Sequence, residues 1–138
     1  MLTRDEGLRR KPYLDSTNHV SIGIGRNLTD KGVSGRTIDQ MFQEDLDEAF
    51  LGAKDFFPDM DSWTPARQMA VINMVFNLGS FGFEKFKATR AAIERGDWDE
   101  AADHALNSKW ATQVHGRSLR VAYMLRTGEI PDDYTETT

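Results

Sequence analysis

Two hydrophobic periods divide the chain. Over Val20–Gly25 apolar residues alternate with small or polar ones, and a period of two predicts a β-strand with one small, polar face. From about residue 37 onward apolar residues recur at three- to four-residue intervals, which predicts amphipathic helices. The pattern therefore predicts an α+β protein that is mostly helical.

The first 35 residues predict a short helix, a hairpin and a loop. Residues 1–6 form a helical lead-in that Gly7 ends. Pro12 prevents the helix from resuming, and residues 16–18 (Ser-Thr-Asn) are typical of a turn between two extended segments. Residues 28–35, rich in Gly, Asp and Ser, predict a loop.

Two polar side chains are predicted to meet in the hairpin. If the turn is centred on Asn18, Asp15 and Ser21 lie opposite each other, because each is three residues from the centre. Asp15 could serve only as an acceptor in an Asx turn, and in such a polar place it should stay ionised. Ser21 is either a small strand residue or a hydroxyl that holds a water beside Asp15.

Helix boundaries are marked by capping residues and glycines. Thr37 with Gln40 three residues later predicts a capping box for a helix to about Lys54. Thr64-Pro65 predicts the start of a helix that is apolar on nearly every side, and is therefore buried and central, until Gly79. Further helices are predicted over residues 85–95, over 97–106 with Asp97 and Glu100 at its start, after Ser108, and over 117–126.

A chain of 138 residues has room for one domain. We expect a single domain with an N-terminal lobe over residues 1–36, a connecting helix over 37–55, a helical lobe over 56–134 and a disordered tail over 135–138.

Composition removes several function classes. The chain has no cysteine, which excludes thiol nucleophiles and thiolate metal sites. Its net charge of −5 argues against a dedicated nucleic-acid binder. No apolar run reaches the roughly 20 residues that span a bilayer, and we see no signal-peptide pattern. His19, His104 and His115 lack metal-ligand spacing and are expected on the surface, so we predict no metal and no cofactor.

Glu6 and Asp15 are the candidate acid and base. Glu6 ends the first predicted helix, where the negative end of the helix dipole favours a protonated carboxyl. Glycoside hydrolysis needs one carboxyl that is protonated and one that is ionised. Trp63, Trp98 and Trp110 could stack on sugars, but core packing is the more common role of such residues.

Several segments of the chain resemble a known family. Residues 4–29, RDEGLRRKPYLDSTNHVSIGIGRNLT, are similar to the start of the phage-type lysozymes, glycoside hydrolase family 24, as found in T-even phages. The shared pattern is Asp-Glu-Gly-Leu-Arg, an Asp nine residues after the Glu, a Ser or Thr six residues later, and Ile-Gly-Ile-Gly. Further similar segments follow in order at residues 70–79 (AVINMVFNLG), 98–102 (WDEAA), 108–110 and 117–128.

The resemblance covers nearly the whole chain and implies a two-lobed lysozyme-like fold and an endo-acting muramidase. Such an enzyme cleaves the β-1,4 bond between N-acetylmuramic acid and N-acetylglucosamine in peptidoglycan. By position, the resemblance implies Glu6 as general acid, Asp15 as the group that acts on the attacking water or stabilises the sugar cation, and Ser21 as the residue that orients the water. It also implies inversion at the anomeric carbon, which needs carboxyls about 6.5–9.5 Å apart.

The resemblance further implies sugar contacts, a partner and a cellular location. The family's substrate-contact positions fall at Asn27, Phe76, Thr89 and His104, and Arg117 matches a basic residue near the acid. Peptidoglycan is then the expected partner of a monomer that does not insert into membranes. We expect synthesis in the host cytoplasm without a signal peptide, and passage to the wall through a phage-made membrane lesion.

Two other functions remain open. A lytic transglycosylase breaks the same bond without water, and the presence of Asp15 and Ser21 argues against it. A wall-binding or virion module without catalysis would tolerate the loss of Glu6 or Asp15, yet both are present.

Overall fold

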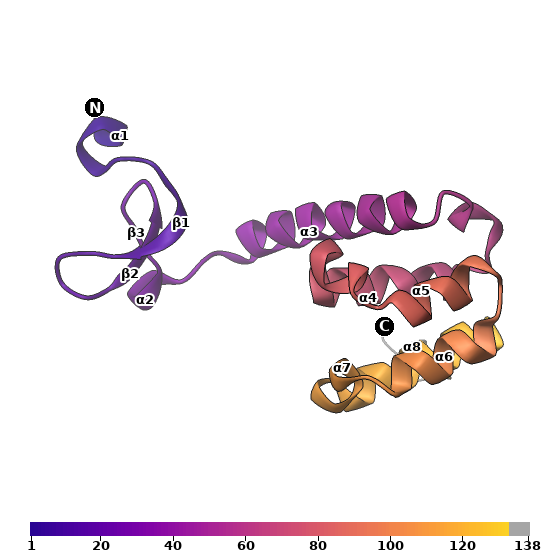
Figure 1. Cartoon of the computed structure of the whole chain (residues 1–138). Helices are drawn as coiled ribbons and strands as arrows, with labels where there is room; N and C mark the ends of the chain where they lie inside the picture. Colours follow the sequence, from indigo (N-terminus) through magenta and orange to yellow (C-terminus); the bar gives the residue numbers. More distant parts are fainter. Residues whose placement is uncertain (133–138) are drawn as a thin grey trace. The chain divides into compact units, whose positions relative to one another are not determined.

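The computed structural model describes residues 1–132. Its chain separates into two units, Met1–Gln43 and Glu44–Thr138. The first unit carries the only sheet among the described residues, and the second is helical (Figure 1). The predicted fold class, α+β and mostly helical, is confirmed. The tail expected over residues 135–138 lies outside the described residues.

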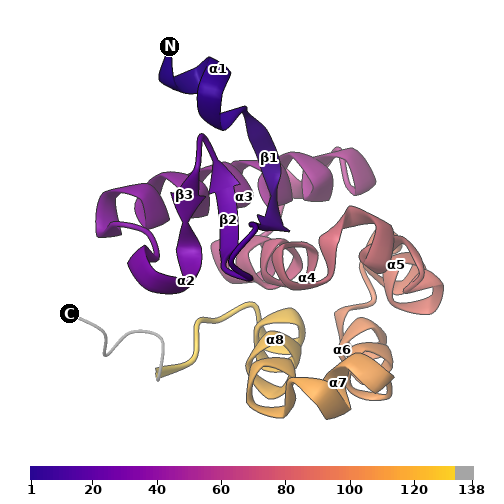
Figure 2. The ribbon, with the colours of Figure 1, turned by 90° about the vertical axis from the view of Figure 1, so that its left-hand side faces the viewer.

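The N-terminal unit contains a short helix and a three-stranded antiparallel sheet of order β1-β2-β3, with β2 in the middle (Figure 2). Gly7 ends helix α1, as predicted: it is the residue after the last helical one, and its N–H donates to the Thr3 carbonyl. The elements of the unit are α1 (Leu2–Glu6), β1 (Arg9–Leu14), β2 (Val20–Gly23), β3 (Arg26–Asn27), α2 (Leu28–Lys31) and the first part of α3 (Gly35–Phe56).

The hairpin register differs from the predicted one. Ser21 pairs with Tyr13, not with Asp15, so the turn is centred on Thr17. The reason is a tight turn in which Asn18 adopts a left-handed φ of 66° and donates its N–H to the Asp15 carbonyl at 3.1 Å. Asp15 then faces His19, whose carbonyl accepts the Asp15 N–H at 2.9 Å. The prediction that Asp15 lies opposite Ser21 is therefore wrong.

The second strand is shorter than the alternation predicts. It ends at Gly23, and Ile24-Gly25 form the turn into β3. Gly23 and Gly25 have φ values of 70° and 68°, which side-chain-bearing residues rarely adopt. Burial is also unusual, because Ser21 is only 3% exposed while Val20 is 38% exposed. The small polar face of this strand is the buried one.

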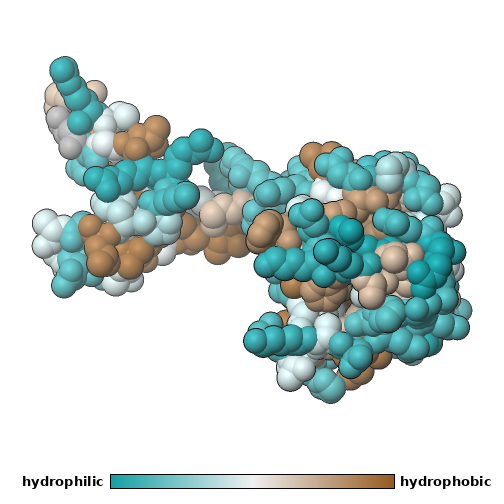
Figure 3. Space-filling view, in the orientation of Figure 1, coloured by the Kyte–Doolittle hydropathy of each residue, from teal (hydrophilic) through white to brown (hydrophobic). Residues whose placement is uncertain are grey.

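Two helix starts also differ from the predictions. The loop expected over residues 28–35 contains α2, because the Asn27 side chain caps it by accepting the Asp30 N–H at 3.1 Å. Helix α3 begins near Ser34, whose hydroxyl accepts the Thr37 N–H at 3.1 Å, so Ser34 and not Thr37 is the cap. Apolar side chains lie at the surface along α3 (Figure 3), namely Ile38, Met41, Phe42, Phe50 and Leu51.

Capping residues set the helices of the second unit largely as predicted. Thr64, Asp97 and Ser108 each accept a backbone N–H from the residue three positions later. Gly79, with φ 73° and ψ 161°, interrupts α4, and a further helical segment follows it that was not predicted. The elements are η1 (Met60–Ser62), α4 (Pro65–Glu84), α5 (Lys87–Glu94), α6 (Trp98–Leu106), α7 (Lys109–Gln113) and α8 (His115–Thr127).

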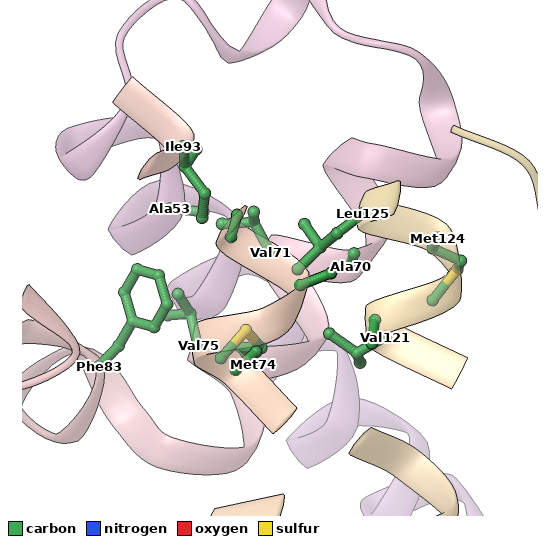
Figure 4. Close-up of a cluster of buried hydrophobic side chains, with 14 of the residues drawn as sticks. Ala53, Ala70, Val71, Met74, Val75, Phe83, Ile93, Val121, Met124 and Leu125 are labelled. Carbon is green, nitrogen blue, oxygen red and sulfur yellow. The ribbon is translucent and has the colours of Figure 1, made fainter. Parts of the chain in front are cut away.

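The core of the second unit surrounds α4. Val71, Met74 and Val75 from α4 lie in a buried cluster with Phe83, with Ile93 of α5 and with residues of α8 (Figure 4). The predicted central buried helix is therefore confirmed. Full burial of each large apolar side chain is worth about 1.5–3 kcal/mol.

The three tryptophans take the core role that was the more common expectation. Trp110 is 4% exposed, and its indole N–H donates to Asn77 Oδ1 at 2.7 Å. Trp63 and Trp98 are half-buried and pack edge to face, with ring centroids 5.0 Å apart. Within residues 1–132 no helix has the length and apolar character that crossing a membrane requires.

Candidate functional site

Asp15 is held by the hairpin turn through one of its carboxylate oxygens. Oδ1 accepts hydrogen bonds from Thr17 N at 2.8 Å, from Thr17 Oγ1 at 2.8 Å and from His19 N at 2.9 Å. The His19 backbone bond and then the Thr17 side-chain bond lower the pKa of Asp15 below its ordinary value. This confirms the expectation that Asp15 stays ionised.

Ser21 faces the other oxygen of the same carboxylate. Its hydroxyl is buried in the middle strand and lies 3.5 Å from Asp15 Oδ2. That distance is long for an O–H···O hydrogen bond, so the contact is weak. Oδ1 is saturated by three short bonds, and Oδ2 is therefore the oxygen with free capacity to accept a proton. The structure brings Asp15 and Ser21 together as expected, although in a different register.

Glu6 is the last residue of α1 and its side chain is exposed. Its carboxyl lies directly over Gly25 in the turn between β2 and β3. A Cβ placed on Gly25 would come within 2.5 Å of Glu6 Oε2 and 2.9 Å of its Cδ. A side chain at position 25 would displace this carboxyl, so glycine there leaves room for Glu6.

The predicted sugar-contact residue of the first unit is occupied by local bonds. The Asn27 amide nitrogen donates to Asp30 Oδ2 at 2.9 Å, and its oxygen accepts the Asp30 N–H. Asn27 thus caps α2 with both ends of its amide. That it also contacts sugar stays a prediction.

Two predicted substrate residues of the second unit line one cavity of about 620 Å³. Thr89 on α5 is buried in its wall, and His104 on α6 is half-buried. Trp110 and Phe86 supply apolar lining. The wall also carries three lysines, at positions 85, 87 and 109, so the cavity is apolar inside and cationic at several points.

His104 is held by a carboxylate on its own helix. Glu100 Oε1 lies 3.2 Å from His104 Nε2, and Glu100 also pairs with Arg95. The hydrogen bond from Arg95 and then that from His104 lower the pKa of Glu100 to about 2. Glu100 is therefore ionised at neutral pH, and its carboxylate lies against the His104 ring at the cavity.

The remaining predicted residues lie elsewhere in the second unit. Phe76 on α4 is 39% exposed and lines a separate cavity of about 170 Å³. Arg117 lies half-buried in the first turns of α8. Among residues 1–132 no group of three or more histidine or acidic side chains is arranged to hold a metal ion.

Sequence reasoning missed Thr17, His19 and Gly25. His19 was expected on the surface, yet it is half-buried and lies beside Asp15. The signal was present as an Asp followed two residues later by Thr and four later by His. An Asx-type turn directs the backbone N–H groups at such positions to the Asp side chain.

The chain is similar to known proteins over most of its length. The family described as phage lysozyme matches residues 3–127. The chain is 30% identical to probable T4-type lysozyme 2 of Dictyostelium discoideum over 164 residues, covering 96% of this chain and 95% of that protein. Probable T4-type lysozyme 1 of the same organism is 27% identical over 162 residues, covering 94% of each protein.

A third relative is much longer. The pre-baseplate central spike protein of Enterobacteria phage T4 is 31% identical over 158 residues, covering 94% of this chain. The chain spans only 28% of the length of that spike protein. Since the family match extends over most of the 138 residues, the chain belongs to the phage lysozyme family.

Proposed function

We propose that the chain is an endo-acting muramidase that hydrolyses the β-1,4 bond between N-acetylmuramic acid and N-acetylglucosamine in peptidoglycan. Membership of the phage lysozyme family supports a cell-wall hydrolase of the muramidase type. The observation that carries the finer proposal is the carboxylate of Asp15, with Oδ1 saturated and Oδ2 beside the Ser21 hydroxyl.

In this proposal Asp15 and Ser21 handle the attacking water. A water that donates to Asp15 Oδ2 and is held by Ser21 Oγ would lose its proton to Oδ2 as its oxygen attacks the anomeric carbon. The short bonds to Oδ1 keep the carboxylate in one orientation during this step. The configuration at the anomeric carbon is then inverted, because the water attacks from the face opposite the leaving group.

Glu6 is the proposed general acid. It would donate its proton to the glycosidic oxygen as the bond breaks. Its position beside Gly25 supports this role, because the glycine leaves room for the carboxyl beside the turn between β2 and β3. General-acid assistance is typically worth 10²–10⁴-fold in rate.

The 620 Å³ cavity of the second unit is a proposed binding site for sugar or peptide groups of peptidoglycan. Thr89 and His104 offer hydrogen bonds to the sugar amides and hydroxyls, and the lysines match the carboxylates of peptidoglycan. Phe76, Asn27 and Arg117 stay as further proposed contacts. The protein would act as a monomer on the wall of bacteria whose membrane has been permeabilised, which would lyse them.

Clearing of permeabilised Gram-negative cells tests the proposal. Glu6→Gln should fold normally and lose lysis, because an amide cannot donate the proton. Glu94→Gln is the matched control, since Glu94 is also an exposed glutamate that ends a helix. Full activity of Glu6→Gln would show that another group is the acid. Asp15→Asn, compared with Asp97→Asn at the α6 cap, makes the same test for the base.

Product analysis separates hydrolysis from the alternative. Hydrolysis adds one water to the products, whereas a lytic transglycosylase forms an anhydro-sugar without adding mass. Inversion predicts an α-configured reducing end as the first product by NMR. A β-configured first product would mean that Asp15 attacks the sugar directly.

A further inference from the structure

A chain of polar contacts connects the proposed base to a second carboxylate through His19. Thr17 Oγ1 lies 2.8 Å from Asp15 Oδ1 and 2.6 Å from His19 Nδ1. On the far side of the ring, His19 Nε2 lies 3.5 Å from Asp30 Oδ2. The His19 ring is therefore placed between two carboxylates, one of them Asp15.

The Thr17 hydroxyl has one proton and two acceptors within reach. When His19 is protonated, its Nδ1–H donates to Thr17 Oγ1, and the Thr17 proton is directed to Asp15 Oδ1. Its Nε2–H then points at Asp30, so both ring nitrogens face oxygen acceptors.

Loss of the ring proton changes this arrangement. Neutral His19 with its proton on Nε2 keeps the contact with Asp30. Its bare Nδ1 then accepts a hydrogen bond from the Thr17 hydroxyl. Asp15 Oδ1 then keeps only its two backbone donors. The other neutral form would set the bare Nε2 against the Asp30 carboxylate, which is repulsive.

We propose that His19 is a positioning residue that acts on Asp15 through the Thr17 hydroxyl, directing its proton toward Asp15 when the ring is charged and away when it is neutral. The role in catalysis rests on the proposed function of Asp15, whereas the coupling itself is a property of the turn.

The charged groups around the turn are shared among three elements. Asp15 approaches the ring from the end of β1 and Asp30 approaches it from α2. The other charged side chains of the neighbouring elements are Arg9, Arg10 and Lys11 on β1, Arg26 on β3 and Lys31 on α2. Of these, Arg9 lies over the Tyr13 ring and Arg26 donates to the Gly32 carbonyl. Both therefore have partners other than His19.

Carbon-13 NMR of the Asp15 carboxyl measures the coupling without any need for activity. In His19→Gln the Asp15 midpoint should rise, because the ring that lies beside the carboxylate and bonds to Thr17 is lost. His115→Gln, an exposed histidine of the second unit, is the matched control and should leave the midpoint unchanged. An unchanged midpoint in His19→Gln would overturn the proposal.

The route through Thr17 has its own test. Thr17→Val should also raise the Asp15 midpoint, because the side-chain hydrogen bond from Thr17 to the carboxylate is lost. The shift of the Asp15 midpoint in the double variant should be smaller than the sum of the shifts in the two single variants, because both changes act through one shared hydroxyl. Fully additive shifts would refute the relay and leave only direct attraction between the two charges.

Activity measurements separate this proposal from the proposed function. The acidic limb of the kcat/KM profile should move to higher pH in His19→Gln by the same amount as the NMR midpoint. If Asp15→Asn retains full activity, the proposed function fails, and NMR still decides the coupling. If Asp15→Asn is inactive but the His19→Gln limb does not move, the proposed function stands and His19 has no part in it.

Discussion

Replacing Gly25 by alanine is the sharpest test of how the proposed acid is placed. The backbone there has φ 68°, and a new Cβ would lie 2.5 Å from Glu6 Oε2 and 2.9 Å from its Cδ. Carbon atoms pack at about 3.5–4.0 Å. The carboxyl must therefore withdraw by about 0.6–1 Å, which it can do because it ends a flexible side chain.

Gly23→Ala is a control with the same backbone problem and no new contact. Its φ is 70°, and nothing lies within 4 Å of the position that its Cβ would occupy. Both variants should lose about 1–2 kcal/mol of stability from the left-handed backbone. Only Gly25→Ala should displace Glu6, and a misplacement of about 1 Å can cost about 10²-fold in rate.

The two variants are compared by thermal unfolding and by initial rates of cell clearing, below the unfolding transition. We expect similar drops in Tm and a loss of about 10²-fold in rate for Gly25→Ala alone. Equal loss of rate in both variants would mean that the turn acts through stability. Full activity of Gly25→Ala would show that the contact with Glu6 does not position a catalytic group.

Three further predictions concern other side chains. Ser21→Ala should lose about 1–3 kcal/mol of transition-state stabilisation with little change in Tm, whereas Ser21→Thr should keep most activity. The measurement is kcat/KM, and an unchanged value in Ser21→Ala would exclude the water-holding role of Ser21. Asn77→Ala leaves the Trp110 indole N–H without its partner, so calorimetry should show a loss of about 1–3 kcal/mol, with Asn77→Asp losing less because it keeps an acceptor. The lowered pKa of folded Asp15 contributes stability that is present above its ordinary value of 3.8 and is lost as the pH falls through the folded value. The Tm advantage of the wild type over Asp15→Asn should therefore shrink as the pH falls from about 5 to 2, whereas a constant gap would contradict the assigned shift.

Local capping chemistry explains why much of the helical unit could be predicted. Thr64, Asp97 and Ser108 each satisfy an N–H group of their own helix, so the signal and the bond lie within four residues. Thr37 was misread because Ser34 offers the same chemistry three residues earlier. Two adequate caps in one short segment cannot be ranked from the sequence alone.

The hairpin could be predicted in kind but not in register. A left-handed Asn18 moved the centre of the turn by one residue, which turned the expected partner of Asp15 from Ser21 to His19. Asp15 and Ser21 were still predicted as neighbours, because residues on adjacent strands stay within reach after such a shift. Thr17 and His19 were missed because their roles depend on that turn geometry.

The candidate catalytic groups are also close in the chain, and this has a kinetic consequence. The side-chain contacts described for Glu6, Asp15 and Ser21 lie between α1 and the turn at Gly25, and the pairing of Ser21 with Asn27 on β3 joins residues only six apart in the chain. Contacts of such short range need little loop closure, and hairpins form in about 1–10 μs. The geometry of these groups should therefore assemble early in folding and re-form quickly after local opening. Hydrogen exchange at the amides of Thr17 and His19 would then report a local opening that is faster than the unfolding of the helical core.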